Sequence, residues 1–288
     1  MSRRRTAKPR LSPVWMPYLR DKLADYVGDV NHWQDERRAT PADSDYRRLL
    51  DNVWTESQRI RTASMWWVSR DMTTLALHAA FHEDLPPTPA PSPNGFILFD
   101  GGLEFEGDPM APHANIVGLQ WQTEYGPPVQ YQFVPYTDTP RLIAESHLRL
   151  PLAPIQPYEE HRRKQAIKQY GHILQAVWAL SAEPTVCQTT SPKHSSTDQT
   201  PLPPKLEETA AKQVRMLILR ENLQRPGTGQ TSRTHAEYSH RFIVRGFWRN
   251  QQYGPHNSLR RRQWIPPYVK GPADKPLICK ETVRVWRR

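Results

Sequence analysis

Apolar residues spaced three or four positions apart predict three helices in the N-terminal part of the chain. Residues 41–63 repeat apolar side chains at helical spacing, and Thr40-Pro41 provides an N-cap followed by a proline in the first turn. Similar apolar stripes predict helices over residues 70–82 and 159–182. The proline-rich stretch 85–93 cannot be helical, because proline lacks the backbone N–H that a helix interior needs. We therefore expect an extended connector there.

After this connector the apolar period changes to two residues, which is the spacing of β-strands. Gly95–Phe99 (GFILF) predicts a short buried strand. Asn115–Gln122 and Val129–Val134 predict a hairpin, because the turn-forming Gly126-Pro127-Pro128 lies between them. Helices followed by a small sheet and a covering helix predict one α+β domain for residues 11–183.

The C-terminal part of the chain predicts a second, mostly antiparallel β domain over residues 207–288. Val214–Leu219 (VRMLIL) is dense in aliphatic residues and favours a strand, with a helix extending from Leu206 as the alternative. Ser239–Arg249 alternates two sets of side chains and predicts the clearest strand of the chain. Further strands are expected at Gln263–Val269 and Leu277–Trp286.

Residues 184–206, which are rich in Ser, Thr, Gln and Pro, separate the two predicted domains. Such a stretch buries too little apolar surface to offset its ordering entropy, so we expect a disordered linker. Residues 1–10 form a basic tail, with five Lys or Arg and no acid. The predicted fold class is α+β: a helical and β N-terminal domain, a Ser/Thr/Pro-rich linker and a small, mostly antiparallel β C-terminal domain.

The positive charge of the chain is concentrated at its C-terminal end. The 288 residues carry a formal net charge of +10. Residues 238–288 hold twelve Lys and Arg against two acids, so this segment alone accounts for the whole excess, and residues 11–237 are mildly acidic. A basic segment of this kind indicates DNA or RNA as the partner.

Composition narrows the class of protein further. Ten tryptophans exclude a wholly disordered chain, and no apolar run is long enough to predict a membrane span. Cys187 and Cys279 are too few for a disulfide framework, and no apolar region follows the N-terminal arginines as it would in a secretory signal. We therefore expect a cytoplasmic protein without a membrane partner.

Arginine and aromatic residues interleave in the C-terminal domain, and this pattern predicts a binding site. Side chains on one face of a strand over Ser239–Arg249 would repeat about every 6.6–7 Å, close to the separation of phosphates along a nucleic-acid strand. Arg260–Arg262 are expected on the adjoining loop, and aromatic rings would stack on unpaired bases. The predicted nucleic-acid-binding residues are Arg241, Arg245, Phe247, Arg249, Arg260, Arg261, Arg262, Trp264 and Lys270.

The same basic face has two other interpretations. It is solvated without a partner, or it pairs with acidic groups, either of the N-terminal domain or of another protein. In the last case the chain is a protein-interaction module that binds an acidic partner.

Several short motifs in the C-terminal segment carry a family resemblance: His240–Arg249 (HRFIVRGFWR), Tyr253-Gly254-Pro255, Arg261 and Trp264–Pro272 (WIPPYVKGP). Together they are similar to a C-terminal module, VRGxWR…YGP…WIxPYVKGP, of uncharacterised proteins from actinobacteria, their phages and mobile elements. The resemblance covers residues 238–288, and its relatives often have His at the position of Phe247. It implies a cytoplasmic accessory protein of a bacterium, phage or mobile element, and no activity is known for the family.

An acidic loop gives an alternative, catalytic hypothesis. Asp100, Glu104, Glu106 and Asp108 follow a predicted strand within nine residues. Such carboxylates can hold Mg²⁺ or act as an acid–base pair in an enzyme that acts on nucleic acid or a nucleotide. The other interpretation is a glycine-supported turn with solvated acids. The sequence contains neither a phosphate-binding glycine loop nor a nucleophile elbow.

His78 and His82 lie four residues apart on a predicted helix, a spacing that two zinc ligands can share. No third ligand is marked in the sequence, so we expect structural or surface histidines, no metal and no other cofactor. Trp66-Trp67 precede the same helix, and we expect them to pack in a core.

Overall fold

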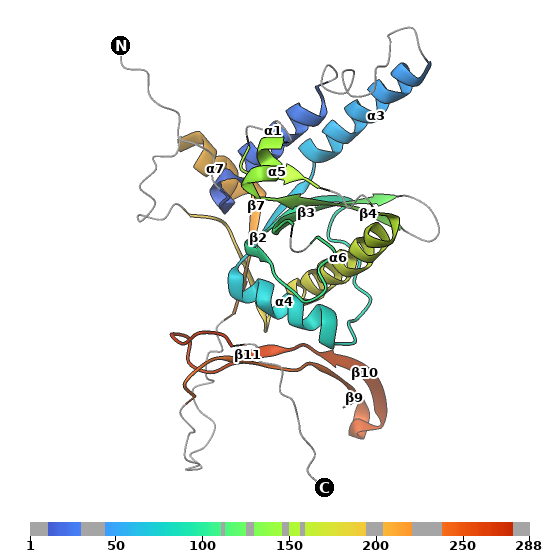
Figure 1. Ribbon diagram of the computed structural model, residues 1–288. Coiled ribbons are helices and arrows are strands. Elements are labelled where there is room, and N and C mark those ends of the chain that lie inside the picture. Colours follow the sequence, from blue (N-terminus) through green and yellow to red (C-terminus); the bar gives the residue numbers. More distant parts are fainter. Residues whose placement is uncertain are drawn as a thin grey trace. The chain divides into compact units, whose positions relative to one another are not determined.

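The computed structural model describes residues 11–29, 44–110, 113–124, 130–145, 150–155, 159–193, 204–220 and 238–278 (Figure 1). The predicted basic tail, the turn at residues 126–128, the middle of the predicted linker and most of the predicted strand Leu277–Trp286 lie outside these ranges. The chain forms two compact units. The first unit holds Met1–Ser69, Ala90–Gly171 and Thr189–Leu217, and the second holds Arg70–Pro89, His172–Gln188 and Ile218–Arg288.

A seven-stranded mixed sheet, with strand order β5-β4-β3-β2-β1-β7-β6, is the largest element of the fold. Its central strand β1 pairs in parallel with both β2 and β7, and β2, β3, β4 and β5 follow one another in antiparallel pairs. The bounds are β1 Ser64–Val68, β2 Asn94–Leu103, β3 Ile116–Glu124, β4 Gln130–Thr137, β5 Ala153–Pro154, β6 Cys187–Thr190 and β7 Val214–Leu219. The predicted strands at β2, β3, β4 and β7 and the β3–β4 hairpin pairing are confirmed.

Three strands of this sheet, β1, β5 and β6, were not predicted. β1 contains Trp66 and Trp67, which are 6% and 8% exposed, so the expectation that both pack in a core is confirmed. β6 lies inside the predicted linker, where Cys187 is buried and the N–H of Arg220 donates to the carbonyl of Val186 at 2.7 Å. These backbone and apolar contacts offset the ordering cost that the polar composition suggested for this part of the chain.

Six α-helices lie within the described residues: α1 Met16–Val27, α3 Ser44–Arg61, α4 Arg70–His82, α5 Pro140–Glu145, α6 Glu160–Ser181 and α7 Pro204–Gln213. The predicted helices at α3, α4 and α6 are confirmed. α1 was not predicted, and it follows a short 3-10 helix at Pro13–Trp15. Pro13 and Pro17 lie in the first turns of these two elements, where the missing N–H has no helical partner to lose. The fold class is thus mixed helix and sheet.

The core of the first unit forms where α1, α3 and α7 cover one face of the sheet (Figure 1). Leu19 of α1, Ile60 of α3 and Ala210 of α7 pack in one cluster with Trp67 and Phe96 of the sheet. Full burial of a large apolar side chain contributes about 1.5–3 kcal/mol, so this layer is a major source of stability for the unit.

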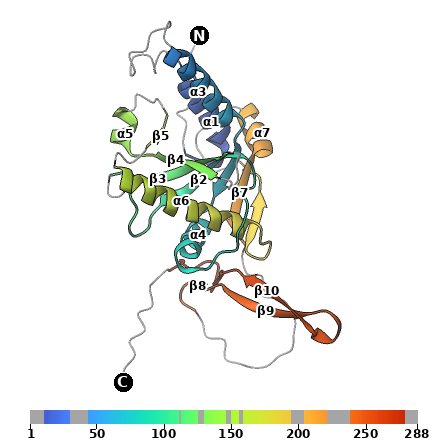
Figure 2. The same ribbon diagram turned by 90° about the vertical axis from the view of Figure 1, so that its right-hand side faces the viewer.

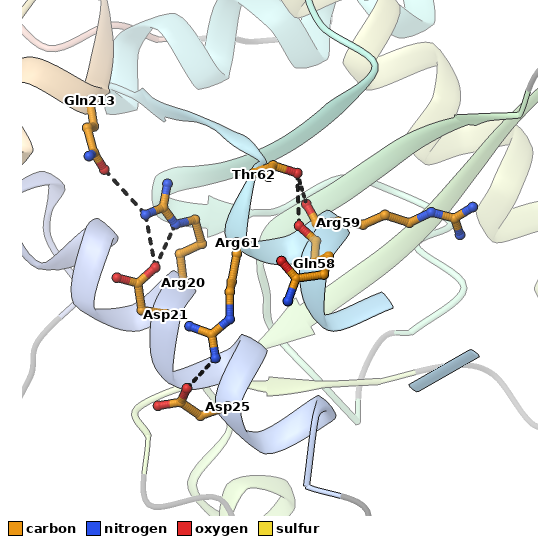
Figure 3. Close-up of polar contacts among 8 residues, drawn as sticks. All are labelled: Arg20, Asp21, Asp25, Gln58, Arg59, Arg61, Thr62 and Gln213. Carbon is orange, nitrogen blue, oxygen red and sulfur yellow. Dashed lines mark hydrogen bonds and ion pairs between the residues drawn. The ribbon is translucent and has the colours of Figure 1, made fainter. Parts of the chain in front are cut away.

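Polar contacts at the surface join the same three helices (Figure 3). Arg61 of α3 forms an ion pair of 2.5 Å with Asp25 of α1, and its hydrogen bond lowers the pKa of that carboxyl. Arg20 of α1 donates to the side-chain oxygen of Gln213 in α7 at 3.3 Å. The Thr62 hydroxyl donates to the carbonyl of Gln58 at 2.9 Å, which satisfies a carbonyl in the last turn of α3.

The C-terminal part of the second unit consists of two antiparallel strand pairs. β8 Phe242–Val244 pairs with β11 Tyr268–Lys270, and β9 Phe247–Tyr253 pairs with β10 Leu259–Ile265. The antiparallel pairing was predicted. The prediction of one continuous strand over Ser239–Arg249 was wrong, because the chain breaks between β8 and β9.

Gly246 explains this break. A Cβ atom at Gly246 would lie 2.7 Å from the carbonyl oxygen of Ile265 and 2.8 Å from the ring of Pro267, so only glycine allows this close approach. The predicted strand Gln263–Val269 is likewise divided, at Pro266-Pro267, into β10 and β11. Arg260–Arg262, which were expected on a loop, lie within β10.

Candidate nucleic-acid interface

The register of the β9–β10 hairpin sorts its side chains into two faces. Directly paired residues such as Trp248 and Trp264, or Tyr253 and Leu259, project from the same face of an antiparallel pair. The face that we call the docked face carries Trp248, Asn250, Gln252, Arg260, Arg262 and Trp264. The opposite face, which we call the open face, carries Phe247, Arg249, Gln251, Tyr253, Leu259, Arg261, Gln263 and Ile265.

The base of the docked face contacts the segment just after α4, within the second unit. The Trp248 indole N–H donates to the carbonyl of Asp84 at 2.7 Å. The Arg262 guanidinium forms an ion pair of 3.1 Å with the Asp84 carboxylate and lies 4.4 Å from the centre of the Trp248 ring. Trp264 is 7% exposed. The ring of Trp264, which was predicted to stack on bases, therefore belongs to the support of the hairpin.

Arg241 and Arg245 are also held by groups of the second unit. Arg241 pairs with Asp71 at 2.7 Å and donates to the carbonyl of Lys275 at 2.6 Å. Arg245 donates to the carbonyl of His82, the last residue of α4, and lies 3.9 Å from the carboxylate of Glu83. Because Arg241 precedes β8 and Arg245 lies between β8 and β9, the predicted strand face that would align them with Arg249 does not exist.

Glu83 is the buried centre of this support. Its side chain is 3% exposed and accepts a hydrogen bond of 3.0 Å from the N–H of Gly246. Burial raises the pKa of Glu83, and the Gly246 hydrogen bond and Arg245 oppose that shift. His78 lies 3.9 Å from the same carboxylate, and burial, followed by the charges of His82 and Arg245, lowers its pKa to about 4. His78 is therefore neutral at physiological pH.

The open face presents apolar rings and cations to solvent. Phe247, Tyr253 and Leu259 are 56%, 41% and 48% exposed. The Arg261 guanidinium lies 5.5 Å from the centre of the Tyr253 ring, and within the described residues Arg249 has neither a hydrogen bond nor an ion pair. This face gathers three predicted residues, Phe247, Arg249 and Arg261.

Two of the predicted cations, Lys270 and Arg260, lie outside the open face, and two residues of the open face were not predicted. Lys270 lies in β11, 5.3 Å from the ring centre of Tyr238, and Arg260 is exposed on the docked face beyond the contacts with Asp84. Tyr253 and Leu259 were not predicted as site residues. Side chains two positions apart on a strand project from the same face, so Tyr253 shares the face of Phe247 on β9 and Leu259 shares the face of Arg261 on β10. This count requires the hairpin register, which the sequence alone does not give.

The acidic loop does not assemble a comparable site. Asp108 accepts hydrogen bonds from the hydroxyl of Tyr170 at 2.8 Å and from the N–H of Met110 at 3.0 Å, and burial raises its pKa. Glu104 and Glu106 are exposed, and Asp100 is partly buried in β2, where the register with β3 shifts between Leu98 and Leu103. The described residues contain no group of three or more His, Cys, Asp or Glu side chains placed to hold a metal ion. Asp108 thus fixes the loop to α6.

Comparison with protein-family models gives no match, and comparisons with curated proteins and with solved structures give none either. None of the helices in the described ranges has the length and apolar character needed to cross a membrane. The assignment of function therefore rests on the geometry and charge of the hairpin.

Proposed function

We propose that this protein binds nucleic acid through the open face of the β9–β10 hairpin. The observation that carries the proposal is the combination of Arg249 and Arg261, which have no acidic partner in the described residues, with the exposed rings of Phe247 and Tyr253 on the same face. Guanidinium groups neutralise phosphate charge and release counterions, and aromatic and apolar side chains add contact area against sugars and bases.

The distribution of ion pairs supports this choice of face. Of the six arginines between residues 238 and 278, Arg241, Arg245 and Arg262 lie next to the acids Asp71, Glu83 and Asp84. Those arginines hold the C-terminal strands against these acids. The remaining three, which are Arg249 and Arg261 on the open face and Arg260 near the tip on the docked face, supply the cations for a polyanion.

The same proposal assigns nucleic-acid binding to the C-terminal part of the chain. The basic C-terminal β module is the binding element, and the sequence adds four further Lys or Arg between residues 279 and 288. These cations increase the non-specific attraction to phosphate. In this view the protein is an accessory nucleic-acid-binding protein that acts in the cytoplasm of a bacterium, or on the nucleic acid of a phage or mobile element.

Fluorescence anisotropy with the full chain tests the proposal. Labelled 25-nucleotide DNA and RNA, single-stranded and duplex, are titrated between about 30 and 300 mM salt. Because each neutralised phosphate contributes about 0.9 to the slope of log affinity against log salt, the double variant R249A/R261A is expected to lose up to about two units of slope. The control R162A/R163A removes the same charge from exposed positions on α6 and should leave the slope unchanged. Absence of binding to every probe at the lowest salt would overturn the proposal.

A further inference from the structure

The centre of the open face carries a more specific pattern than charge alone. Arg249 lies directly opposite Gln263, and Gln251 lies directly opposite Arg261. Two arginines and two glutamines thus form a two-by-two block on neighbouring strands. Apolar pairs border the block on both sides, with Phe247 and Ile265 at one end and Tyr253 and Leu259 at the other.

These side chains match the base edges that are displayed in the major groove of DNA. Arginine donates two hydrogen bonds to O6 and N7 of guanine, and glutamine pairs with N6 and N7 of adenine. Apolar side chains contact the methyl group of thymine. The glutamine amides at the centre of the face add hydrogen-bonding groups that can contact base edges as well as phosphate.

The dimensions of the hairpin favour a duplex over a single strand. Phe247 and Tyr253 are six residues apart on one strand, which places their rings about 20 Å apart, much too far to stack on consecutive unpaired bases. A two-stranded antiparallel ribbon fits the roughly 12 Å width of the major groove of B-form DNA. The deep, narrow major groove of duplex RNA does not admit it.

The hairpin is also free to enter a groove. Figure 2 shows β9 and β10 as a two-stranded ribbon that extends to one side of α4, which belongs to the same unit. Its contacts with residues 82–84 lie at the base, at Trp248 and Arg262. Toward the tip both faces are open, since Asn250, Gln252 and Arg260 on the docked face are exposed.

We propose that the β9–β10 ribbon binds in the major groove of duplex DNA and reads base sequence through Arg249, Gln251, Arg261 and Gln263. The inference rests on the proposed function and specifies its ligand. Arg260, on the other face of the ribbon, then lies toward the phosphate backbone.

The test begins with selection of binding sites from a random duplex DNA library by the full chain. The selected sequence is then compared as DNA duplex, as each single strand and as RNA duplex. The expected result is an enriched motif that contains guanine and adenine, bound at least tenfold more tightly as DNA duplex than in the other forms. Methylation of guanine N7, which projects into the major groove, is expected to weaken binding at positions within the motif.

Neutral variants separate base reading from charge. Q251A and Q263A leave the net charge unchanged, and each is expected to lower discrimination against a substituted adenine by about 5- to 150-fold, the range of one bidentate contact. Q252A, on the docked face of the same strand, is the matched control and should retain the motif. Thermal unfolding by circular dichroism verifies that all three variants are folded.

The outcomes are distinct. Tighter binding of single strands than of duplex, or duplex binding with no enriched motif and no effect of N7 methylation, overturns this inference and leaves the proposed function standing. Failure to bind any nucleic acid overturns both. An enriched motif that is unchanged in Q251A and Q263A overturns the assigned reading residues.

Discussion

Glu83, at the end of α4, accepts a hydrogen bond of 3.0 Å from the backbone N–H of Gly246, at the junction of the two C-terminal strand pairs. The two residues are 163 positions apart in the sequence. Their contact joins a buried carboxylate to one of the two residues, Arg245 and Gly246, that separate β8 from β9. It therefore sets where the ribbon begins and which of its faces is left open.

Replacing Gly246 with alanine tests this junction. The added Cβ would meet the Ile265 carbonyl at 2.7 Å and Pro267 at 2.8 Å, so we expect a loss of about 1–3 kcal/mol in the free energy of unfolding. Chemical denaturation followed by tryptophan fluorescence measures the loss. The control is G171A in α6, where the nearest atom would lie at 3.4 Å. Equal stability of G246A and the unmodified chain would contradict the role assigned to this glycine.

The partly buried imidazole of His78 predicts a loss of stability on acidification. Its pKa of about 4 in the folded chain is below the ordinary value of 6.5, so the unfolded state binds more protons between these two pH values. The free energy of unfolding therefore falls as the pH decreases from about 6.5 toward 4, by up to about 2 kcal/mol at pH 5. Glu83 acts in the opposite direction, because its raised pKa favours proton uptake by the folded state.

The variant H78N isolates this contribution. We expect its unfolding midpoint in urea to change less between pH 7 and pH 5 than that of the unmodified chain. H161N serves as the control, since the side chain of His161 is 74% exposed on α6. A pH dependence of H78N that equals that of the unmodified chain would show that His78 titrates normally.

Asp84 places a negative charge beside the ribbon, and its removal is expected to strengthen binding. In D84N the Arg262 guanidinium loses its ion pair, while the backbone carbonyl that accepts from Trp248 remains. The pair is exposed, so little stability is lost. We expect about two- to fivefold tighter binding of DNA at 50 mM salt, measured by anisotropy. E104Q, which makes the same charge change on the acidic loop, should have no effect; a similar gain in both variants would refute a local role for Asp84.

Arg260 is expected to contact phosphate without reading sequence. Its guanidinium donates to the carbonyls of Asn257 and Leu259 near the tip of the ribbon. The variant R260A should lose about one unit of the salt slope and keep the same preferred sequence. Comparison of its selected motif and its affinity at several salt concentrations checks both statements. A changed motif would place Arg260 against the bases.

Many helices and strands of the chain could be predicted from local patterns, because period and turn residues act over short distances. The apolar stripes of α3, α4 and α6 and the alternation in β3 and β4 identified those elements. β1 was missed because its five residues are too short and too uniformly apolar to show a period. Its identity as a strand comes from β2 and β7, which pair with it on either side.

The sequence predicted which kinds of residue form the candidate site. It did not predict which of those residues share one face of the hairpin. Phe247, Arg249 and Arg261 were identified from the interleaving of aromatic and basic residues, and they share the open face. The same pattern included Arg262 and Trp264, which face the end of α4 instead. No local signal separates the two groups, because the partner of Arg262 is Asp84, 178 positions earlier in the chain.

The position of β1 has a consequence for how the chain folds. Met65 pairs with Val214, so the centre of the sheet joins segments about 150 residues apart. A nascent chain that has not yet extended past residue 217 leaves one edge of β1 unpaired. Pairings of such high contact order form slowly, so we expect the sheet to close late, after the helices of the first unit have formed.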